Sequence, residues 1–530
     1  MNTTLARGGP TGPNVGPATQ FANRTGGSNV SDLNKPTLGH WINGRRVVGE
    51  TARRAAVFDP ALGKATKEVV LADATEAAAA VEAARLAYEG WSQLSAARRQ
   101  TVVFRFRELL NSRKEELARI ITGEHGKAVS DAAAEVQRGL EVVDLATAFP
   151  HLTSGRYAQN VSTGVDVHSV RQPLGVVAVI SPFNFPAMVP LWFAPIAIAV
   201  GNTVVLKPSE RVPSAAIWLA ELWKAAGLPD GVFNVLQGDR VAVETLLNHP
   251  DVQAVSFVGS TPVARSIYES AARVGKRVQA FGGAKNHMLV LADADLDAAA
   301  DQAVSGGFGS AGERCMAISV VLAEESIADE LNARIQERAA TLRVGDGRTD
   351  PDLGPLITRQ HRDRVASYID IAERDGATVL VDGRHCRVDG HENGFWLGPT
   401  LLDRVPTASK AYEDEIFGPV LAVVRVKDLD EGLRLINSSQ FGNGTAIFTN
   451  DGRAARRFER EVQVGMVGVN VPVPVPVAYF AFGGWKDSLL GDAPAYGPEG
   501  FAFFTRHKAV TSRWVTSTTG SLTMAFPGND

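Results

Sequence analysis

The residue most able to do covalent chemistry is Cys315, which lies among small residues in the segment GSAGERCMA (309–317). Small neighbours would let a substrate approach the sulfur closely. The adjacent Arg314 would favour the thiolate, which is the nucleophilic form of cysteine. A lone cysteine is more often a small buried apolar side chain, and Cys386 also has basic neighbours. The residue type alone therefore leaves nucleophilic catalysis and simple packing both open.

Composition narrows the kinds of partner that the chain can have. It has 530 residues, 45% of them apolar and 21% charged, and a formal net charge of −4. This near balance of charge predicts neither a nucleic-acid partner nor an anionic membrane, and leaves a small-molecule substrate. Two cysteines cannot build a disulfide framework, which indicates a reducing compartment such as the cytoplasm. No cysteine–histidine cluster has zinc spacing, so no metal is expected.

Two segments bear on membrane insertion and targeting. Residues 172–206 carry no charge, but five prolines interrupt them, so we reject a transmembrane span. Residues 1–37 are rich in Gly, Pro, Thr, Ser and Asn and predict a disordered arm. A transit peptide, which would send the protein to the mitochondrial matrix, is the alternative for this arm. Residues 515–530 are expected to form a C-terminal tail.

The elements that must position Cys315 alternate between short β-branched runs and helical patterns. This alternation predicts a parallel sheet covered on both faces, as in a Rossmann-like unit. No GxGxxG follows any of the runs, so a nucleotide site here would not be the standard fingerprint. The strands are expected at 175–180, 202–207, 232–236 and 254–259, and the helices at 214–226, 240–248 and 262–273.

Elements before and after this unit are also predicted. Residues 40–48 indicate a hairpin with Asn43-Gly44 at its turn. Residues 501–514 are typical of an edge strand that joins the sheet of another subunit. Helices are expected at 73–87, 96–124 and 129–147.

The sequence contains five motifs, which are PFNFP (182–186), KPSE (207–210), FVGS (257–260), GSAGERC (309–315) and EIFGPV (415–420). Their order and spacing resemble those of the aldehyde dehydrogenase superfamily, and the resemblance covers about residue 38 to residue 514. It implies an aldehyde dehydrogenase-like α/β fold: a Rossmann-like NAD-binding domain, an α/β catalytic domain and a small β oligomerisation arm. The implied assembly is a homotetramer, with a homodimer as the alternative. The implied NAD-binding domain is 38–155 and 174–280, the catalytic domain 281–480, and the oligomerisation segments 156–173 and 481–514.

The resemblance also implies a mechanism for this oxidoreductase. Cys315 attacks an aldehyde, and the Asn184 amide and the backbone N–H of Cys315 hold the oxyanion. Hydride then leaves for NAD, and a thioester remains on the sulfur. Glu210 favours NAD over NADP because it is acidic where a 2′-phosphate would sit. The residues assigned to NAD are Ser181, Phe183, Lys207, Glu210, Arg211, Gly259, Ser260, Gly282, Glu415 and Phe417. Taken singly, Asn184 could cap a turn, and Lys207 or Glu415 could be a surface charge.

The segment AFGGAKNH (280–287) predicts the fate of the thioester. Hydrolytic members of the superfamily have a glutamate that activates water at the position of Phe281. A general base is worth about 10²–10⁴-fold, so hydrolysis should be slow and the thiol of coenzyme A should accept the acyl group. Glu313 is the alternative base. A hydrolytic aldehyde dehydrogenase acting on another aldehyde, and a catalytically silent structural relative, remain rival interpretations.

Three motifs, GAKNH, GSAGERCMA and GVNVPVPVP (468–476), together resemble the acylating malonate-semialdehyde and methylmalonate-semialdehyde dehydrogenases. This resemblance assigns Arg138 and Arg314 to the substrate carboxylate, which the planar guanidinium fork suits. A helix-face salt bridge is the other interpretation of Arg138. Loss of CO₂ and transfer to coenzyme A would give acetyl-CoA or propionyl-CoA. One methyl is worth only about 1–3 kcal/mol, so both semialdehydes stay open, as do valine, inositol and β-alanine breakdown.

Overall fold

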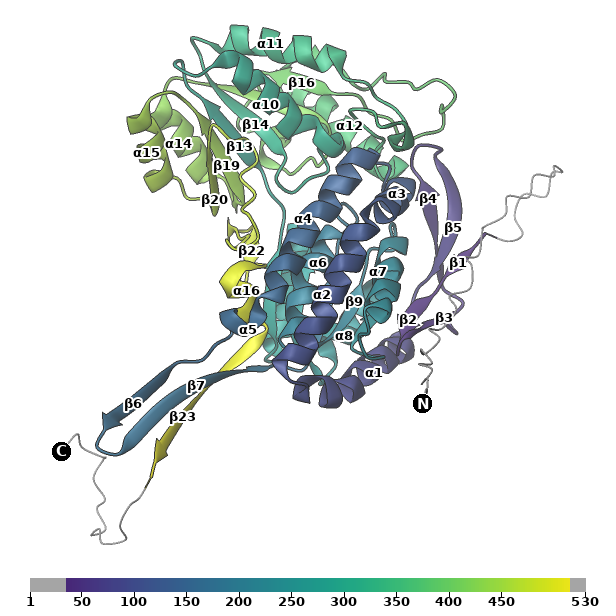
Figure 1. The fold of residues 1–530 in the computed structure, drawn as a ribbon. Coiled ribbons are helices and arrows are strands. Elements are labelled where there is room, and N and C mark those ends of the chain that lie inside the picture. The colour runs from purple at the N-terminus through teal and green to yellow at the C-terminus, as the bar shows by residue number, and fades with distance from the viewer. Residues whose placement is uncertain (1–34, 515–530) are drawn as a thin grey trace, which may run out of the picture. The chain divides into compact units, whose positions relative to one another are not determined.

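The computed structural model describes residues 35–514, in which two large β-sheets carry most of the helices (Figure 1). The first sheet has the strand order β22-β12-β11-β8-β9-β10-β2-β3, and its five strands from β12 to β10 are parallel. The four strands predicted in this unit are therefore confirmed as β8 to β11. The strands are β2 (His40–Ile42), β3 (Arg45–Val47), β8 (Val176–Ile180), β9 (Thr203–Lys207), β10 (Phe233–Val235), β11 (Val252–Val258), β12 (Arg277–Phe281) and β22 (Leu489–Leu490).

Helices cover this sheet on both faces, as predicted, because successive side chains of a strand point to opposite faces. In β8, Val177 and Val179 pack into one core, whereas Val176 and Ala178 pack into the other. Helices α6 and α7 contact the strands in the first core, and α1, α8 and α9 do so in the second. The helices are α1 (Ala74–Gln93), α2 (Ala96–Ser112), α3 (Lys114–His125), α4 (Val129–Thr147), α5 (Phe149–Leu152), α6 (Met188–Ala199), α7 (Ser214–Ala225), α8 (Arg240–Asn248) and α9 (Thr261–Arg273).

Local sequence signals explain several element boundaries. Asp73 caps α1 in a reciprocal capping box with Glu76. The helix predicted at 96–124 is divided in two, because Arg113 adopts a non-helical backbone (φ −119°) between α2 and α3. The 40–48 hairpin is confirmed, and Asn43 and Gly44 both have positive φ at its turn.

The uncharged stretch 172–206 is interior protein. Every residue of β8, α6 and β9 is buried, so the lack of charge reflects burial on all sides of the element. Among residues 35–514, no helix combines the length and the apolar character that a membrane crossing requires.

The second sheet has the order β15-β16-β17-β14-β13-β19-β20, and all its strands are parallel except β15. Figure 1 shows it in green with its own set of helices. Its strands are β13 (Asn286–Val290), β14 (Ile318–Glu324), β15 (Thr378–Val381), β16 (Thr400–Asp403), β17 (Val420–Val426), β19 (Gly444–Phe448) and β20 (Met466–Val469). Its helices are α10 (Leu296–Phe308), α11 (Ala328–Thr341), α12 (Arg359–Arg374), α13 (Lys410–Glu413), α14 (Leu429–Ser438) and α15 (Gly452–Glu461).

A third sheet, of order β23-β7-β6, contains the predicted edge strand (Figure 1). Its strands are β6 (Tyr157–Ser162), β7 (Val165–Pro173) and β23 (Thr505–Arg513). The prediction of a strand from residue 501 is wrong at its start, because Gly497–Phe503 form helix α16, with Pro498 in its first turn. From Thr505 onward the chain is the edge strand that was expected.

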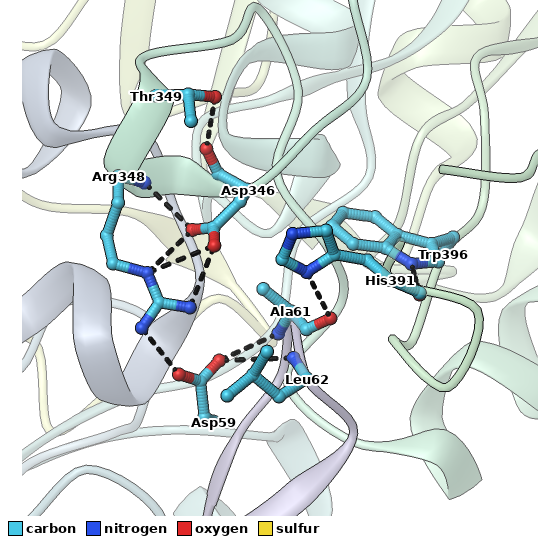
Figure 2. Close-up of polar contacts among 8 residues, drawn as sticks. All are labelled: Asp59, Ala61, Leu62, Asp346, Arg348, Thr349, His391 and Trp396. Atoms are coloured by element: carbon cyan, nitrogen blue, oxygen red, sulfur yellow. Dashed lines mark hydrogen bonds and ion pairs between the residues drawn. The ribbon is translucent and has the colours of Figure 1, made fainter. Parts of the chain in front are cut away.

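The turn between strands β4 (Arg54–Asp59) and β5 (Lys64–Val70) packs on a segment that precedes α12 (Figure 2). Asp59 accepts a hydrogen bond from Arg348 Nη1 at 2.8 Å. Its other oxygen accepts the N–H groups of Ala61 and Leu62 at 3.1 and 3.2 Å. This contact attaches the β4–β5 hairpin to the part of the chain that carries the second large sheet. Strand β1 (Thr37–Leu38) pairs with β5. Apart from residues 35–37, the predicted N-terminal arm lies outside the described residues, as does the predicted C-terminal tail.

Candidate active site

A cavity of about 730 Å³ has walls from both large sheets. One wall follows the carboxyl ends of β8, β11 and β12, which is the edge where open α/β sheets bind ligands. The other wall comes from α12 and the segments 414–417 and 440–441. The cavity brings together these sequence-predicted residues: Phe183, Asn184, Arg211, Gly259, Ser260, Gly282, Cys315, Glu415 and Phe417. Ser181, Lys207, Glu210, Arg138 and Arg314 lie outside its lining.

Two positions in this wall require glycine because neighbouring atoms lie too close to leave room for a Cβ. A Cβ added to Gly259 would lie 2.4 Å from the Phe257 ring, and one added to Gly282 would lie 2.5 Å from the Asp487 carbonyl oxygen. Ser260 is the N-cap of α9, but its side chain makes no capping hydrogen bond. The N–H groups of the first turn, which begins at the cavity wall, therefore lack a side-chain acceptor from the N-cap. A positive helix end of this kind suits a phosphate.

The charged residues assigned to the cofactor are buried or half-buried. Lys207 is buried, and its Nζ lies 3.5 Å from Glu210 Oε2. Desolvation lowers the pKa of Lys207. Glu415 is half-buried, and its Oε1 accepts the Ala284 N–H at 2.9 Å. Burial raises the pKa of Glu415 to about 7. The interpretation of Lys207 and Glu415 as surface charges is therefore wrong.

Aromatic rings form the part of the cavity nearest α12. The Phe183 and Phe417 rings lie 5.9 Å apart and nearly perpendicular, and the Arg211 guanidinium lies 5.4 Å from the Phe183 ring. Phe417 has a strained φ of +60°. Its carbonyl oxygen lies 2.7 Å from His361 Nε2. Sequence reasoning missed His361, because it stands in a helix far from every motif.

The loop before Cys315 has an unusual backbone. Ser310, Ala311 and Gly312 all have positive φ, and a Cβ on Gly312 would meet the Gly418 carbonyl oxygen at 2.1 Å. Two side-chain amides then hold the main chain of Cys315. Asn286 Nδ2 and Asn443 Nδ2 donate to the Cys315 carbonyl oxygen at 2.9 and 3.0 Å. Asn286 belongs to the GAKNH motif, so that motif positions Cys315.

The thiol of Cys315 is partly buried and lines the cavity. Burial, and secondly the Glu415 carboxylate, raise the pKa of Cys315 to about 12. The Arg314 charge acts in the opposite direction but only weakly, and its guanidinium is paired with Asp131. Arg314 thus favours the thiolate as expected, but desolvation and the Glu415 charge outweigh its effect on the pKa of Cys315. At neutral pH the sulfur carries its proton.

Asn184 reaches the nucleophile loop from the other sheet. It is buried, and its Nδ2 donates to the Glu313 carbonyl oxygen at 3.0 Å, two residues before Cys315. The side chain thus crosses to another segment and does not cap its own turn. The structure thus brings an amide donor to the loop that carries Cys315.

The position that would hold a water-activating glutamate has no proton acceptor. Phe281 is buried, with its ring 6.1 Å from that of Phe193 and 6.0 Å from that of Phe482. The alternative base, Glu313, is fully buried and is not part of the cavity wall. It lies 3.5 Å from His361 Nε2, and burial raises its pKa to about 8. Glu313 is thus protonated at neutral pH and shielded from the cavity.

The two arginines assigned to a substrate carboxylate have separate internal partners on helix α4. Arg138 Nη1 pairs with Glu141 at 2.7 Å, and its Nη2 donates to the Pro476 carbonyl oxygen at 2.8 Å. Burial raises the pKa of Tyr496, and the charge of the neighbouring Arg138 acts in the opposite direction. Arg314, paired with Asp131, lines a second cavity of about 410 Å³.

Proteins of known family resemble this chain over most of its length. Residues 47–510 match the aldehyde dehydrogenase family. A malonate-semialdehyde dehydrogenase of Pseudomonas aeruginosa is 52% identical over 480 residues, which are 90% of this chain and 96% of the relative. A malonate-semialdehyde dehydrogenase of Geobacillus kaustophilus is 47% identical over 479 residues, covering 90% of this chain and 99% of the relative.

Solved structures agree with these sequence matches. A methylmalonate-semialdehyde dehydrogenase from Oceanimonas doudoroffii superposes with a TM-score of 0.90 at 51% identity, over 91% of this chain and 99% of that chain. A protein from Sinorhizobium meliloti, solved as a complex with NAD, gives 0.90 at 47% identity, over 93% and 100%. The resemblance inferred from the five motifs is thereby confirmed, and the chain belongs to the aldehyde dehydrogenase family.

Proposed function

We propose that the protein oxidises malonate semialdehyde or methylmalonate semialdehyde with NAD and transfers the acyl group to coenzyme A, releasing CO₂ and forming acetyl-CoA or propionyl-CoA. One observation carries the acyl-transfer part. Cys315 lines the main cavity, while the position of the hydrolytic base is Phe281 in an aromatic cluster. The names of the relatives in Pseudomonas aeruginosa and Oceanimonas doudoroffii support the substrate class.

The residues at the strand ends fit NAD. The Lys207–Glu210 pair would hold the adenosine ribose, the open end of α9 at Ser260 would hold the pyrophosphate, and Glu415 would hold the nicotinamide ribose. NAD, when bound, accepts a hydride. The Sinorhizobium meliloti complex with NAD supports this choice of cofactor.

The chain's own residues would then form and hold the acyl group. The Cys315 thiol releases its proton to solvent, and the sulfur attacks the aldehyde carbon. The oxyanion that forms accepts hydrogen bonds from Asn184 Nδ2 and from the backbone N–H of Cys315. Asn184 must release the Glu313 carbonyl to do this. Loss of hydride leaves a thioester on Cys315. Loss of CO₂ from the malonyl group gives an enolate. Its oxygen accepts hydrogen bonds from the same two donors until the α-carbon is protonated.

Deacylation follows from the missing base. Water needs a proton acceptor to attack a thioester quickly, whereas a thiol is the better nucleophile and needs less help. Attack by the coenzyme A thiol restores the Cys315 thiol and releases the acyl-CoA. Arg138 and Arg314 would bind the substrate carboxylate after leaving their internal partners, Glu141 and Asp131.

The decisive experiment measures NADH formed from malonate semialdehyde with and without coenzyme A. We expect one equivalent of NADH per site without the thiol and sustained turnover only with it. Equal steady rates in both cases would contradict acyl transfer. Arg138→Ala should raise KM for malonate semialdehyde and leave propanal unaffected, and equal losses on both substrates would remove Arg138 from the site.

A hydrolytic aldehyde dehydrogenase is the second candidate, because Glu415 lies in the same cavity as Cys315 and has a pKa of about 7. A carboxyl with this pKa could take a proton from water. Production of free acid in the absence of coenzyme A, lost in Glu415→Gln, would favour this candidate. We further propose the domain boundaries given above, a homotetramer or homodimer joined through β23, and a cytoplasmic location.

A further inference from the structure

We propose that Lys127 and Glu135 are positioning residues for the oxyanion donor. Their buried ion pair holds the loop that carries Asn184. This inference rests on the role of Asn184 in the proposed function. Neither residue lines the main cavity.

Lys127 lies between α3 and α4, and 2% of it is exposed. Its Nζ donates to Glu135 Oε2 at 2.9 Å and to the Asn184 carbonyl oxygen at 2.5 Å. The same ammonium lies 4.5 Å from the centre of the Phe185 ring. A buried ammonium therefore contacts both the oxyanion asparagine and the residue after it.

Glu135 holds the other end of the same loop. Its Oε1 accepts the N–H groups of Ala187 and Met188 at 2.8 and 3.1 Å, where α6 begins. With Lys127 on Oε2, both carboxylate oxygens are used, and 3% of the residue is exposed. The pair thus fixes the loop on both sides of Pro186 and attaches it to α4.

Stability alone is a weak reason for such a pair. Desolvating two charges is costly, and apolar residues of similar size often replace a buried pair without loss of stability. Precise placement is a stronger reason, because an oxyanion donor acts only within a narrow range of positions. A displacement of about 1 Å can cost about 10²-fold in rate. Lys127 fixes the Asn184 main chain, so the amide can leave the Glu313 carbonyl without the loop moving.

The test compares the double variant Lys127→Met/Glu135→Leu with the wild-type protein. We expect it to fold and to bind NAD normally, with a lowered thermal midpoint, because the Asn184 carbonyl and the Ala187 and Met188 N–H groups lose their partners. The NADH burst should slow by about 10²-fold with KM for the aldehyde unchanged. A folded double variant with the wild-type burst rate would overturn the proposal. Arg107→Met/Asp144→Asn, which removes a partly exposed ion pair between α2 and α4, is the matched control and should keep the wild-type burst.

A second measurement separates positioning from general damage. Lys127→Met is compared in the wild-type and the Asn184→Ala backgrounds. If Lys127 acts through Asn184, its replacement should cost little further rate once the amide is gone, whereas independent effects would multiply. Glu135→Gln, which keeps an oxygen for Ala187 and Met188, covers the case in which the other variants fail to fold. It should slow the burst by a smaller factor, and an unchanged burst would contradict the proposal.

Each burst is measured with both propanal and malonate semialdehyde. Parallel loss on the two aldehydes indicates a defect of the oxyanion donor. If the wild-type protein gives a burst with propanal and none with malonate semialdehyde, the proposed substrate is wrong. The positioning role of the pair is then still decided by the propanal data.

Discussion

The Glu415 carboxylate should suppress the reactivity of Cys315, and the two pKa values define the pH at which this occurs. Burial and the Glu415 charge raise the pKa of Cys315 to about 12, and burial raises the pKa of Glu415 to about 7. At pH 8 a thiol with this pKa is thiolate in about one molecule in 10⁴, against roughly one in four for an ordinary cysteine. Alkylation should therefore be about 10³-fold slower than for a free thiol.

Replacing Glu415 by glutamine removes the charge and keeps the size. The pKa of Cys315 should fall, and each unit increases the thiolate fraction about tenfold. The sign depends on pH, because Glu415 is itself protonated below about pH 7. The variant should thus react faster than wild type at pH 8–9 and at the same rate near pH 5.5.

Iodoacetamide labelling between pH 5.5 and pH 9 measures this effect. Cys386→Ser in both proteins leaves Cys315 as the single cysteine, and mass spectrometry of the tryptic peptide counts its modification. Glu415→Asp is the matched control, which keeps the charge and should stay slow above pH 7. Identical rates for wild type and Glu415→Gln across this range would refute the coupling. A wild-type rate at pH 7 equal to that of a free thiol would refute the raised pKa.

Three further outcomes follow from the contacts described. Asn184→Ala should slow the NADH burst by about 10²–10³-fold with KM for the aldehyde little changed, because a single oxyanion donor is worth this much; a burst near the wild-type rate would remove the amide from the oxyanion site. Asp131→Asn frees Arg314 from its internal partner, so KM for malonate semialdehyde should fall while KM for propanal stays constant; a parallel change in both would count against Arg314 as a carboxylate ligand. Arg348→Met should lower the free energy of unfolding at pH 7 by about 1 kcal/mol, a value reduced for the partial exposure of Arg348. The hydrogen bond from Arg348 holds the pKa of Asp346 below its usual range, so this contribution is present above the unfolded pKa near 4 and is lost as pH falls through the folded value. The deficit measured by urea unfolding should be smaller at pH 3 than at pH 7, and an equal deficit at both would contradict the assignment.

Local sequence patterns were sufficient for most of the first sheet and its helices. Apolar β-branched runs predicted β8 to β11, and the Asn43-Gly44 turn predicted the first hairpin, because these signals act over a few residues. The same reasoning failed at 501–503, where aromatic residues that favour strands form the end of a helix. There, packing of α16 in the core overrode the local preference.

The family motifs located Cys315, Asn184 and the cavity that joins them, because each motif is a continuous segment that the sequence displays directly. The sequence did not show the partner of Arg314, the contact of His361 with Phe417, or the hold of Lys127 on Asn184. Each of these contacts joins residues 56 or more positions apart. The protonation of Cys315 also had to come from the tertiary structure. Desolvation of the Cys315 thiol depends on all the segments that pack around it and exclude water. The sequence of any one of these segments therefore cannot predict the pKa.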